Sequence, residues 1–223
     1  LPARSAVNIP GLSAEIMERL KPHLQLAETV GLLVSQLAGG HVKEMELRLQ
    51  GEFASHPSQP LVIAALKGLL SAGLGDSINF VNASLEAKAR GIQVLEVKDE
   101  SSRDFAGGSL QITTRGDQGS RSVTGAVFAD GDLRITSIDA FPVNVTPSSH
   151  MLFTRHRDMP GIIGHLGSLL GEHNVNIASM QVGRKIVRGD AVMVLSIADP
   201  IPADLLQTIT AIDGIQEAHP VTL

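Results

Sequence analysis

The sequence predicts an α+β fold, made of a helical connecting arm and two small domains. Three observations lead to this prediction. Apolar residues recur at helical spacing between residues 13 and 36, and apolar and polar residues alternate in short runs between 42 and 138. Between residues 151 and 221, strand-like and helix-like segments follow in the order βαββαβ. With 223 residues, 43% of them apolar, the chain is long enough to bury a proper core.

Residues 1–39 are expected to contain the end of a preceding domain, followed by the arm. Ser13 is suited to cap its helix, and Gly39-Gly40 ends the apolar pattern. Pro22 predicts a break into two helices, because proline removes a backbone donor and clashes with the preceding turn. The chain starts with LPARSAVNIP and no Met, so we expect the arm to connect to an upstream part.

The first domain is expected at residues 40–147. An alternating strand at 42–53 precedes a helix at 58–70, and Asn82 is suited to cap a short helix at 83–90 that Gly91 closes. Four further strands are predicted, separated by turns at Gly116–Gly119 and at Ala129-Asp130-Gly131-Asp132. These strands span residues 92–97, 109–114, 122–128 and 133–138.

The second domain is expected at residues 148–223, after the linker Thr146–Ser149. Its βαββαβ order over about 75 residues is typical of a ferredoxin-like domain, in which two helices cover one face of an antiparallel sheet. The predicted segments are the strands 151–155, 175–182, 191–197 and 215–221 and the helices 161–172 and 203–212.

Composition excludes several classes of function. The net charge of −5, without a basic run, and an aromatic content of 3% argue against a nucleic-acid partner. The absence of Cys excludes disulfide scaffolds, zinc ribbons and thiol catalysis. No apolar run approaches the roughly 20 residues that span a bilayer, so we expect no membrane partner and a soluble, intracellular fragment. No G-x-G-x-x-G, P-loop or G-x-S-x-G motif fits its required context, and we expect no catalytic residues, cofactor or metal in this chain.

The segment RDMPGIIGHLGSLLGEHNVNIASM, residues 157–180, carries polar residues at both ends of a helix. Pro160 suits the first helical position, and Gly161 permits close approach of another backbone. The free N–H groups of such a helix attract a carboxylate, while Asp158 would hold an ammonium group. Asn176 and His156 would face the side chain of the ligand, so a zwitterionic amino acid has the matching polarity.

A plainer interpretation of the same residues stays open at this point. Asp158 would then only favour the helix dipole, and Asn174 and Asn176 would only turn the chain into the next strand.

Two motifs add a resemblance to known families. The runs RHRDMPG and NVNIASMQVGR resemble the ACT domain, a βαββαβ module that usually binds amino acids. Residues 7–37 and 66–92, with FVNA at Phe80–Ala83 as their most specific part, resemble the C-terminal region of the long-form D-3-phosphoglycerate dehydrogenase family. The resemblance covers essentially all 223 residues.

This resemblance implies that the intact protein oxidises 3-phosphoglycerate with NAD in the first step of L-serine synthesis, with its nucleotide and substrate domains upstream. Residues 40–146 resemble the intervening domain, which is thought to bind an anion. The ACT domain resembles the serine sensor, whose site forms between two ACT domains of a homodimer or tetramer. The resemblance assigns effector contacts to His156, Asp158 and Asn176, and we add their motif neighbours Pro160, Gly161 and Ile177. We expect a cytoplasmic location, or the plastid stroma in a plant.

The anion site of the intervening domain is where this chain departs from the family pattern. Residues 138–142, after the fourth of the later strands, carry no Arg, Lys or His. Arg134 remains as a candidate anion contact, although Arg103, Arg115, Arg121 and Arg134 also fit the pattern of solvated charges on strands.

Two alternative functions are compatible with the sequence. The chain could be a free-standing amino-acid-binding subunit that regulates another enzyme. It could also be a purely structural dimerisation module, since pairing of ACT sheets would protect their exposed edges.

Overall fold

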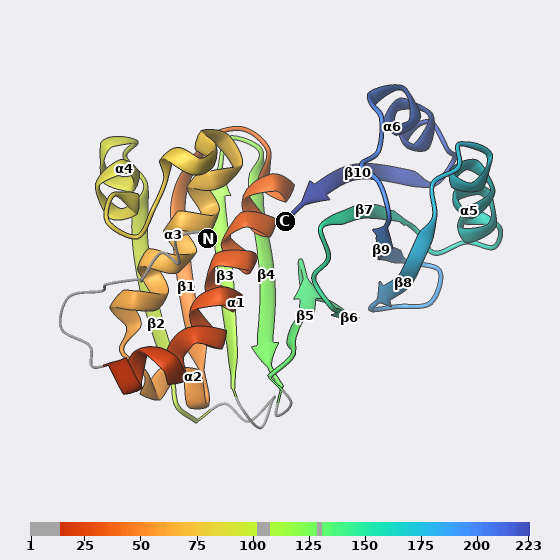
Figure 1. Ribbon diagram of the computed structural model, residues 1–223. Coiled ribbons are helices and arrows are strands. Elements are labelled where there is room, and N and C mark those ends of the chain that lie inside the picture. Colours follow the sequence, from red (N-terminus) through yellow and green to blue (C-terminus); the bar gives the residue numbers. More distant parts are fainter. Residues whose placement is uncertain (1–13, 102–107, 129–130) are drawn as a thin grey trace, which may run out of the picture.

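The computed structural model describes residues 14–101, 108–128 and 131–223 (Figure 1). Within these ranges the chain forms a six-stranded and a four-stranded β-sheet, with the carboxyl terminus between them. The predicted α+β class is therefore confirmed. The predicted cap at Ser13, part of the turn at Ala129-Asp130 and the charge at Arg103 lie outside the described residues.

The six-stranded sheet has the order β2-β1-β3-β4-β5-β6. β1 and β2 are parallel, and the other neighbours are antiparallel. The sequence analysis missed β6, which follows β5 through a tight turn in which Asp139 and Ala140 have φ values of 49° and 59°. The strands are β1 (Val42–Gln50), β2 (Gln93–Asp99), β3 (Ser109–Gly116), β4 (Gly119–Val127), β5 (Leu133–Ile138) and β6 (Phe141–Val145).

The first strand ends earlier than predicted. Gly51 adopts a φ of 60°, and its N–H donates to the carbonyl of Asp99, so the chain leaves the sheet after Gln50. Phe53, predicted to be in the strand, lies instead in the short helix α2 (Glu52–Ser55), where its side chain is buried. The apolar alternation that predicted a longer strand follows the buried face of β1 only up to Leu49, and the next large apolar residue, Phe53, is buried from a helix instead.

Two long helices, α1 (Ala14–Ala38) and α3 (Ser58–Leu74), cover one face of this sheet (Figure 1). The predicted break at Pro22 is wrong, because α1 continues through it as one helix. Leu20 and Leu24 are buried on either side of Pro22, so packing of the helix against the core outweighs the lost hydrogen bond. The helix that we expected to serve as an arm is thus part of the core of the first domain.

The remaining helical segments of the first domain are η1 (Gly75–Ser77) and α4 (Ala83–Ala89). Asn82 occupies the N-cap position of α4, but its side chain does not cap the helix. It accepts a hydrogen bond from the Asn79 N–H and donates one to the Ser77 carbonyl, which fixes the preceding turn. Among the helices that the structure describes, none is both long and apolar enough to cross a membrane.

The four-stranded sheet has the order β10-β7-β9-β8, with all neighbours antiparallel. Its elements follow the predicted βαββαβ order, and two helices cover the face that points away from the first domain (Figure 1). They are β7 (His150–Arg157), α5 (Ile162–Glu172), β8 (Ile177–Arg184), β9 (Asp190–Ile197), α6 (Ala203–Thr210) and β10 (Ile215–Thr222).

The two central strands of the second sheet, β7 and β9, are buried on both faces. On one face, Met193 and Leu195 of β9 pack against the helices α5 and α6. On the other, Phe153 and Val194 join the hydrophobic core of the first domain. The two domains therefore share a packed interface. A conformational change in one domain can alter the other through these direct contacts.

Candidate functional site

The corner between β7 and α5 is exposed at residues 159–161. Gly161 is the N-cap of α5 with a φ of 93°, and its helix begins at Ile162. Pro160 therefore does not hold the first helical position, contrary to prediction, but lies in the exposed turn before it. A Cβ added at Gly161 would meet no described atom within 4 Å, so the positive φ, and not a neighbouring backbone, requires glycine here.

Asp158 is held by the hairpin between β8 and β9. Its Oδ2 accepts hydrogen bonds from Arg184 Nη1 and from the backbone N–H of Arg188, both at 3.1 Å. Its own N–H donates to the Gly189 carbonyl at 2.8 Å. The Arg188 N–H and the Arg184 guanidinium lower the pKa of Asp158, so its carboxylate is charged at neutral pH. The side chain is 23% exposed and remains accessible at the corner.

His156 is buried behind the corner. Only 1% of the residue is exposed, and its Nδ1 lies 3.4 Å from Thr154 Oγ1. Alternate residues of β7 face the helices, and His156 follows Leu152 and Thr154 on that face, so its imidazole is buried and not exposed at the corner. Burial lowers the pKa of His156, and the charge of Asp158 only partly opposes this.

The buried imidazole predicts that acid destabilises the chain. Because the pKa of His156 is lower in the folded state than the ordinary 6.5, the unfolded chain binds a proton first as pH falls. Stability contributed by neutral His156 is present above pH 6.5 and is lost as pH falls through its folded pKa. We expect the fall in unfolding free energy between pH 7 and 5 to be smaller in His156→Leu than in the native chain. Urea melts at several pH values measure it, with the exposed His165→Gln as control; parallel curves for His156→Leu and the native chain would contradict it.

The other end of the predicted site lies far from Asp158 in the same chain. Asn176 is exposed just before β8, and its carbonyl accepts from the Ala198 N–H at 3.1 Å. Ile177 is half-buried and opens β8, which ends at Arg184 beside Asp158. With a rise of about 3.3 Å per residue, the length of this strand places Asn176 roughly 25 Å from the corner. One chain therefore does not bring Asn176 and Asp158 together.

β8 is the outer strand of the four-stranded sheet. Among the described residues, no strand pairs with its second edge, and most of its side chains are exposed. Such an edge is available for pairing with another chain.

Arg134, the candidate anion contact, is paired within its own hairpin. Its Nη2 lies 3.1 Å from Asp132 Oδ2, and its guanidinium carbon lies 5.9 Å from the centre of the Phe128 ring. A neighbouring carboxylate thus already neutralises much of the charge that an anion would need. Among the described residues there is likewise no group of three His, Asp or Glu side chains placed to hold a metal ion.

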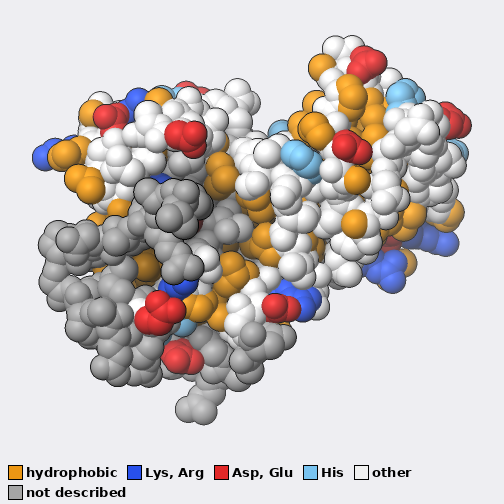
Figure 2. All heavy atoms as spheres, in the orientation of Figure 1, with side chains coloured by type: hydrophobic (Ala, Val, Ile, Leu, Met, Phe, Trp, Pro, Cys, Tyr) orange, Lys and Arg blue, Asp and Glu red, His pale blue; other side chains and the backbone are white. Residues whose placement is uncertain are grey.

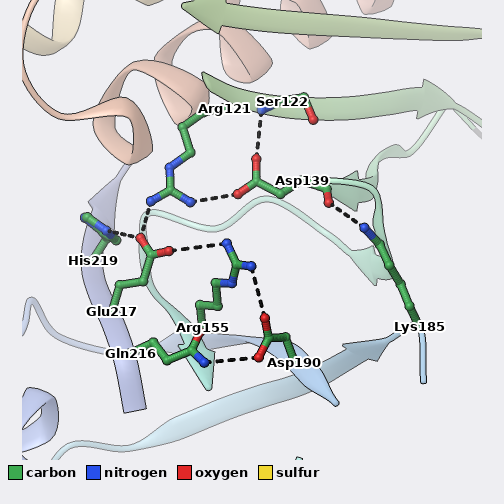
Figure 3. A network of polar contacts seen from close by, with 9 residues as sticks. All are labelled: Arg121, Ser122, Asp139, Arg155, Lys185, Asp190, Gln216, Glu217 and His219. Carbon is green, nitrogen blue, oxygen red and sulfur yellow. Dashed lines mark hydrogen bonds and ion pairs between the residues drawn. The ribbon is translucent and has the colours of Figure 1, made fainter. Parts of the chain in front are cut away.

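Sequence analysis missed an ion network between the two domains (Figure 3). Arg121 of β4, expected to be a solvated strand charge, is only 17% exposed and bonds both Asp139, at 2.7 Å, and Glu217 of β10. Arg155 of β7 bonds Asp190 at 3.2 Å and approaches Glu217 at 3.9 Å. Burial alone would raise the pKa of Glu217, but hydrogen bonds from Arg121 and His219 outweigh it and lower this pKa. The alternation of β4 placed Arg121 on a surface, but that surface is covered by the second domain.

Comparisons with known proteins match both domains. The family profile described as the D-3-phosphoglycerate dehydrogenase intervening domain matches residues 19–139, and the ACT domain profile matches residues 150–214. A D-3-phosphoglycerate dehydrogenase of Synechocystis sp. is 59% identical over 100% of this chain and 40% of its own length. A protein of the same name from Methanocaldococcus jannaschii is 36% identical over 99% of this chain and 42% of its length. D-3-phosphoglycerate dehydrogenase 2, chloroplastic, of Arabidopsis thaliana is 30% identical over 96% of this chain and 36% of its length.

The chain spans about 40% of the length of these curated relatives. Within the chain, the intervening-domain match covers more than half of the 223 residues and falls on the helices and strands of the first domain. The ACT match begins with β7 and contains the corner that holds Asp158. With its two domains matched in this order, the chain belongs to the D-3-phosphoglycerate dehydrogenase intervening-domain family and carries an ACT domain after that domain.

Proposed function

We propose that this chain is the regulatory and oligomerisation region of an NAD-dependent D-3-phosphoglycerate dehydrogenase, and that its ACT domain binds L-serine or a similar amino acid. The observation that carries the proposal is the β7–α5 corner, where a charged Asp158 lies beside the free N-terminus of α5 inside a matched ACT domain. The names of the relatives describe a dehydrogenase of D-3-phosphoglycerate, and in the whole enzyme NAD and this substrate would bind outside the present chain.

The corner suits a zwitterion. The first N–H groups of α5 lack partners within the helix and, with the helix dipole, favour the α-carboxylate of the ligand. Asp158, which is charged at neutral pH, favours its ammonium group. Gly161 leaves the space above the helix start open, so the ligand can approach the backbone closely. His156 stays neutral behind Asp158 and adds no competing charge.

A second ACT domain would complete the site. If β8 of one chain pairs antiparallel with β8 of another about a two-fold axis, the start of one strand lies opposite the end of its copy. That arrangement would bring Asn176 and Ile177 of the partner near Arg184 and Asp158 of the first chain. The exposed edge of β8 supports this pairing, and it explains why one chain separates the two halves of the predicted site.

Asp158→Asn tests the proposal. The variant keeps the size of the side chain but removes the charge, and we expect it to bind L-serine about 10- to 100-fold more weakly, as loss of a charge-assisted hydrogen bond predicts. Isothermal titration calorimetry of the 223-residue chain measures the affinity, and sedimentation measures its oligomeric state. Asp204→Asn, at the start of α6, is the matched control and should bind as the native chain does.

The outcomes separate sensing from assembly. A native dimer that gives no heat with millimolar L-serine or other amino acids would refute the sensing role and favour a purely structural dimerisation module. Binding of L-serine to a strictly monomeric chain would refute the two-chain site.

A further inference from the structure

The hairpin between β8 and β9, residues 184–190, touches both the corner and the first domain. Its residues Arg184, Lys185 and Arg188 are exposed cations, and Figure 2 shows blue side chains gathered at that end of the second domain, at the lower right of the view. Ile186 and Val187 at its tip are also exposed. The two ends of this hairpin make different contacts, and these contacts suggest what it does.

Towards the corner, the hairpin supplies the partners of Asp158. Arg184 and the Arg188 N–H share one carboxylate oxygen, Oδ2, and the Gly189 carbonyl accepts from the Asp158 N–H. Two of these three contacts are made by backbone atoms and are fixed by the hairpin. The third comes from the Arg184 side chain, which is 54% exposed and can swing into solvent.

Towards the first domain, the next residue of the hairpin makes the contact. Lys185 Nζ donates to the Asp139 carbonyl at 3.2 Å and lies 4.3 Å from the centre of the Phe141 ring. Asp139 and Phe141 belong to the β5–β6 turn, and the Asp139 carboxylate binds Arg121 in the ion network of Figure 3. At the base of the hairpin, Gly183 lies so close to β6 that a Cβ would be 3.0 Å from Val143 Cγ1.

We propose that Arg184 is an internal competitor that occupies the ammonium position at Asp158, and that an amino-acid effector displaces it. This inference rests on the proposed function. The guanidinium donates to Asp158 Oδ2 at 3.1 Å, so an ammonium group that binds this oxygen has to take the place of Arg184. Displacement leaves Arg184 without its counter-charge beside Lys185, and like-charge repulsion then weakens the contact of Lys185 with the β5–β6 turn. Occupation of the corner is thereby transmitted to the first domain.

The competition predicts that only one of two matched arginine variants binds L-serine more tightly. Arg184→Met should bind L-serine about 3- to 5-fold more tightly, the range set by the strength of an exposed ion pair. Arg157→Met removes one positive charge from the exposed end of β7 without touching Asp158 and should bind no more tightly than the native chain. Calorimetry of the native chain and both variants measures this. Weaker binding by Arg184→Met would overturn the proposal, because Arg184 would then contact the effector itself.

Transmission to the first domain has a separate readout. Hydrogen exchange of the peptides that contain residues 139–145 should become faster when the native chain is saturated with L-serine. Lys185→Met should still bind L-serine, but its exchange in these peptides should no longer respond, whereas Lys88→Met on α4 should behave as the native chain. A serine response that persists in Lys185→Met would overturn the relay. Absence of serine binding to the native chain would instead contradict the proposed function.

Discussion

Gly68→Ala is expected to lower the unfolding free energy of the chain by about 3 kcal/mol, which corresponds to roughly 10 °C in melting temperature. A Cβ at Gly68 of α3 would lie 2.8 Å from the Glu28 carbonyl carbon and from the Leu32 N of α1, and closer still to the Glu28 carbonyl oxygen. These atoms belong to the backbone of a helix, so they cannot rotate away as a side chain could. The two helices must separate, and the core between α1, α3 and the sheet loses packing along their length.

The same helix offers a matched control. Gly73 of α3 is exposed, and a Cβ there would meet no described atom within 4 Å. Gly73→Ala should therefore raise stability by up to about 1 kcal/mol, because alanine favours helix more than glycine does. Urea and thermal melts followed by circular dichroism measure both variants. Equal stability of Gly68→Ala and the native chain would mean that the helices do not approach each other as closely as the structure shows.

The crossing of these helices illustrates what periodicity predicts and what it leaves out. The spacing of apolar residues predicted both helices, because each helix buries one face and the apolar residues recur on that face. It did not predict which glycines lie at the contact: Gly31 and Gly68 meet the opposite backbone, whereas Gly73 meets nothing. Likewise, Pro22 broke the local pattern but not the helix, since the buried neighbours Leu20 and Leu24 hold both turns against the core.

The second domain could be predicted almost completely because its elements are short, strongly patterned and joined in a common order. β6 could not, because its five residues include Pro142 and its turn uses a positive φ at Asp139 and Ala140 without any glycine. In the site, Asp158 was predicted from the local motif. Its partner Arg184 lies 26 residues further along the chain, and only the pairing of β8 with β9 brings the two together.

Arg121 shows the same limit at the interface, and it carries the second large effect. Arg121→Met should cost about 3 kcal/mol, because Asp139 and Glu217 would remain partly buried with less counter-charge. Arg115→Met is the matched control on the neighbouring strand. Arg115 also pairs with two glutamates, Glu44 and Glu46, but it is 49% exposed, so its loss should destabilise the chain much less than the loss of Arg121.

A double-mutant cycle separates the ion network from simple loss of packing. If Arg121 acts through Glu217, the variant that combines Arg121→Met with Glu217→Gln should be more stable than the sum of the two single changes predicts. Urea melts of the four chains measure this coupling, and limited proteolysis shows whether the second domain separates before the first unfolds. Strict additivity would mean that Arg121 does not stabilise the chain through Glu217. Coupling between Arg121 and Glu217 would mean that ion pairs stabilise the interface between the two domains. Lys185 contacts the β5–β6 turn at the same interface, so an effector bound at Asp158 could act on these ion pairs through Lys185.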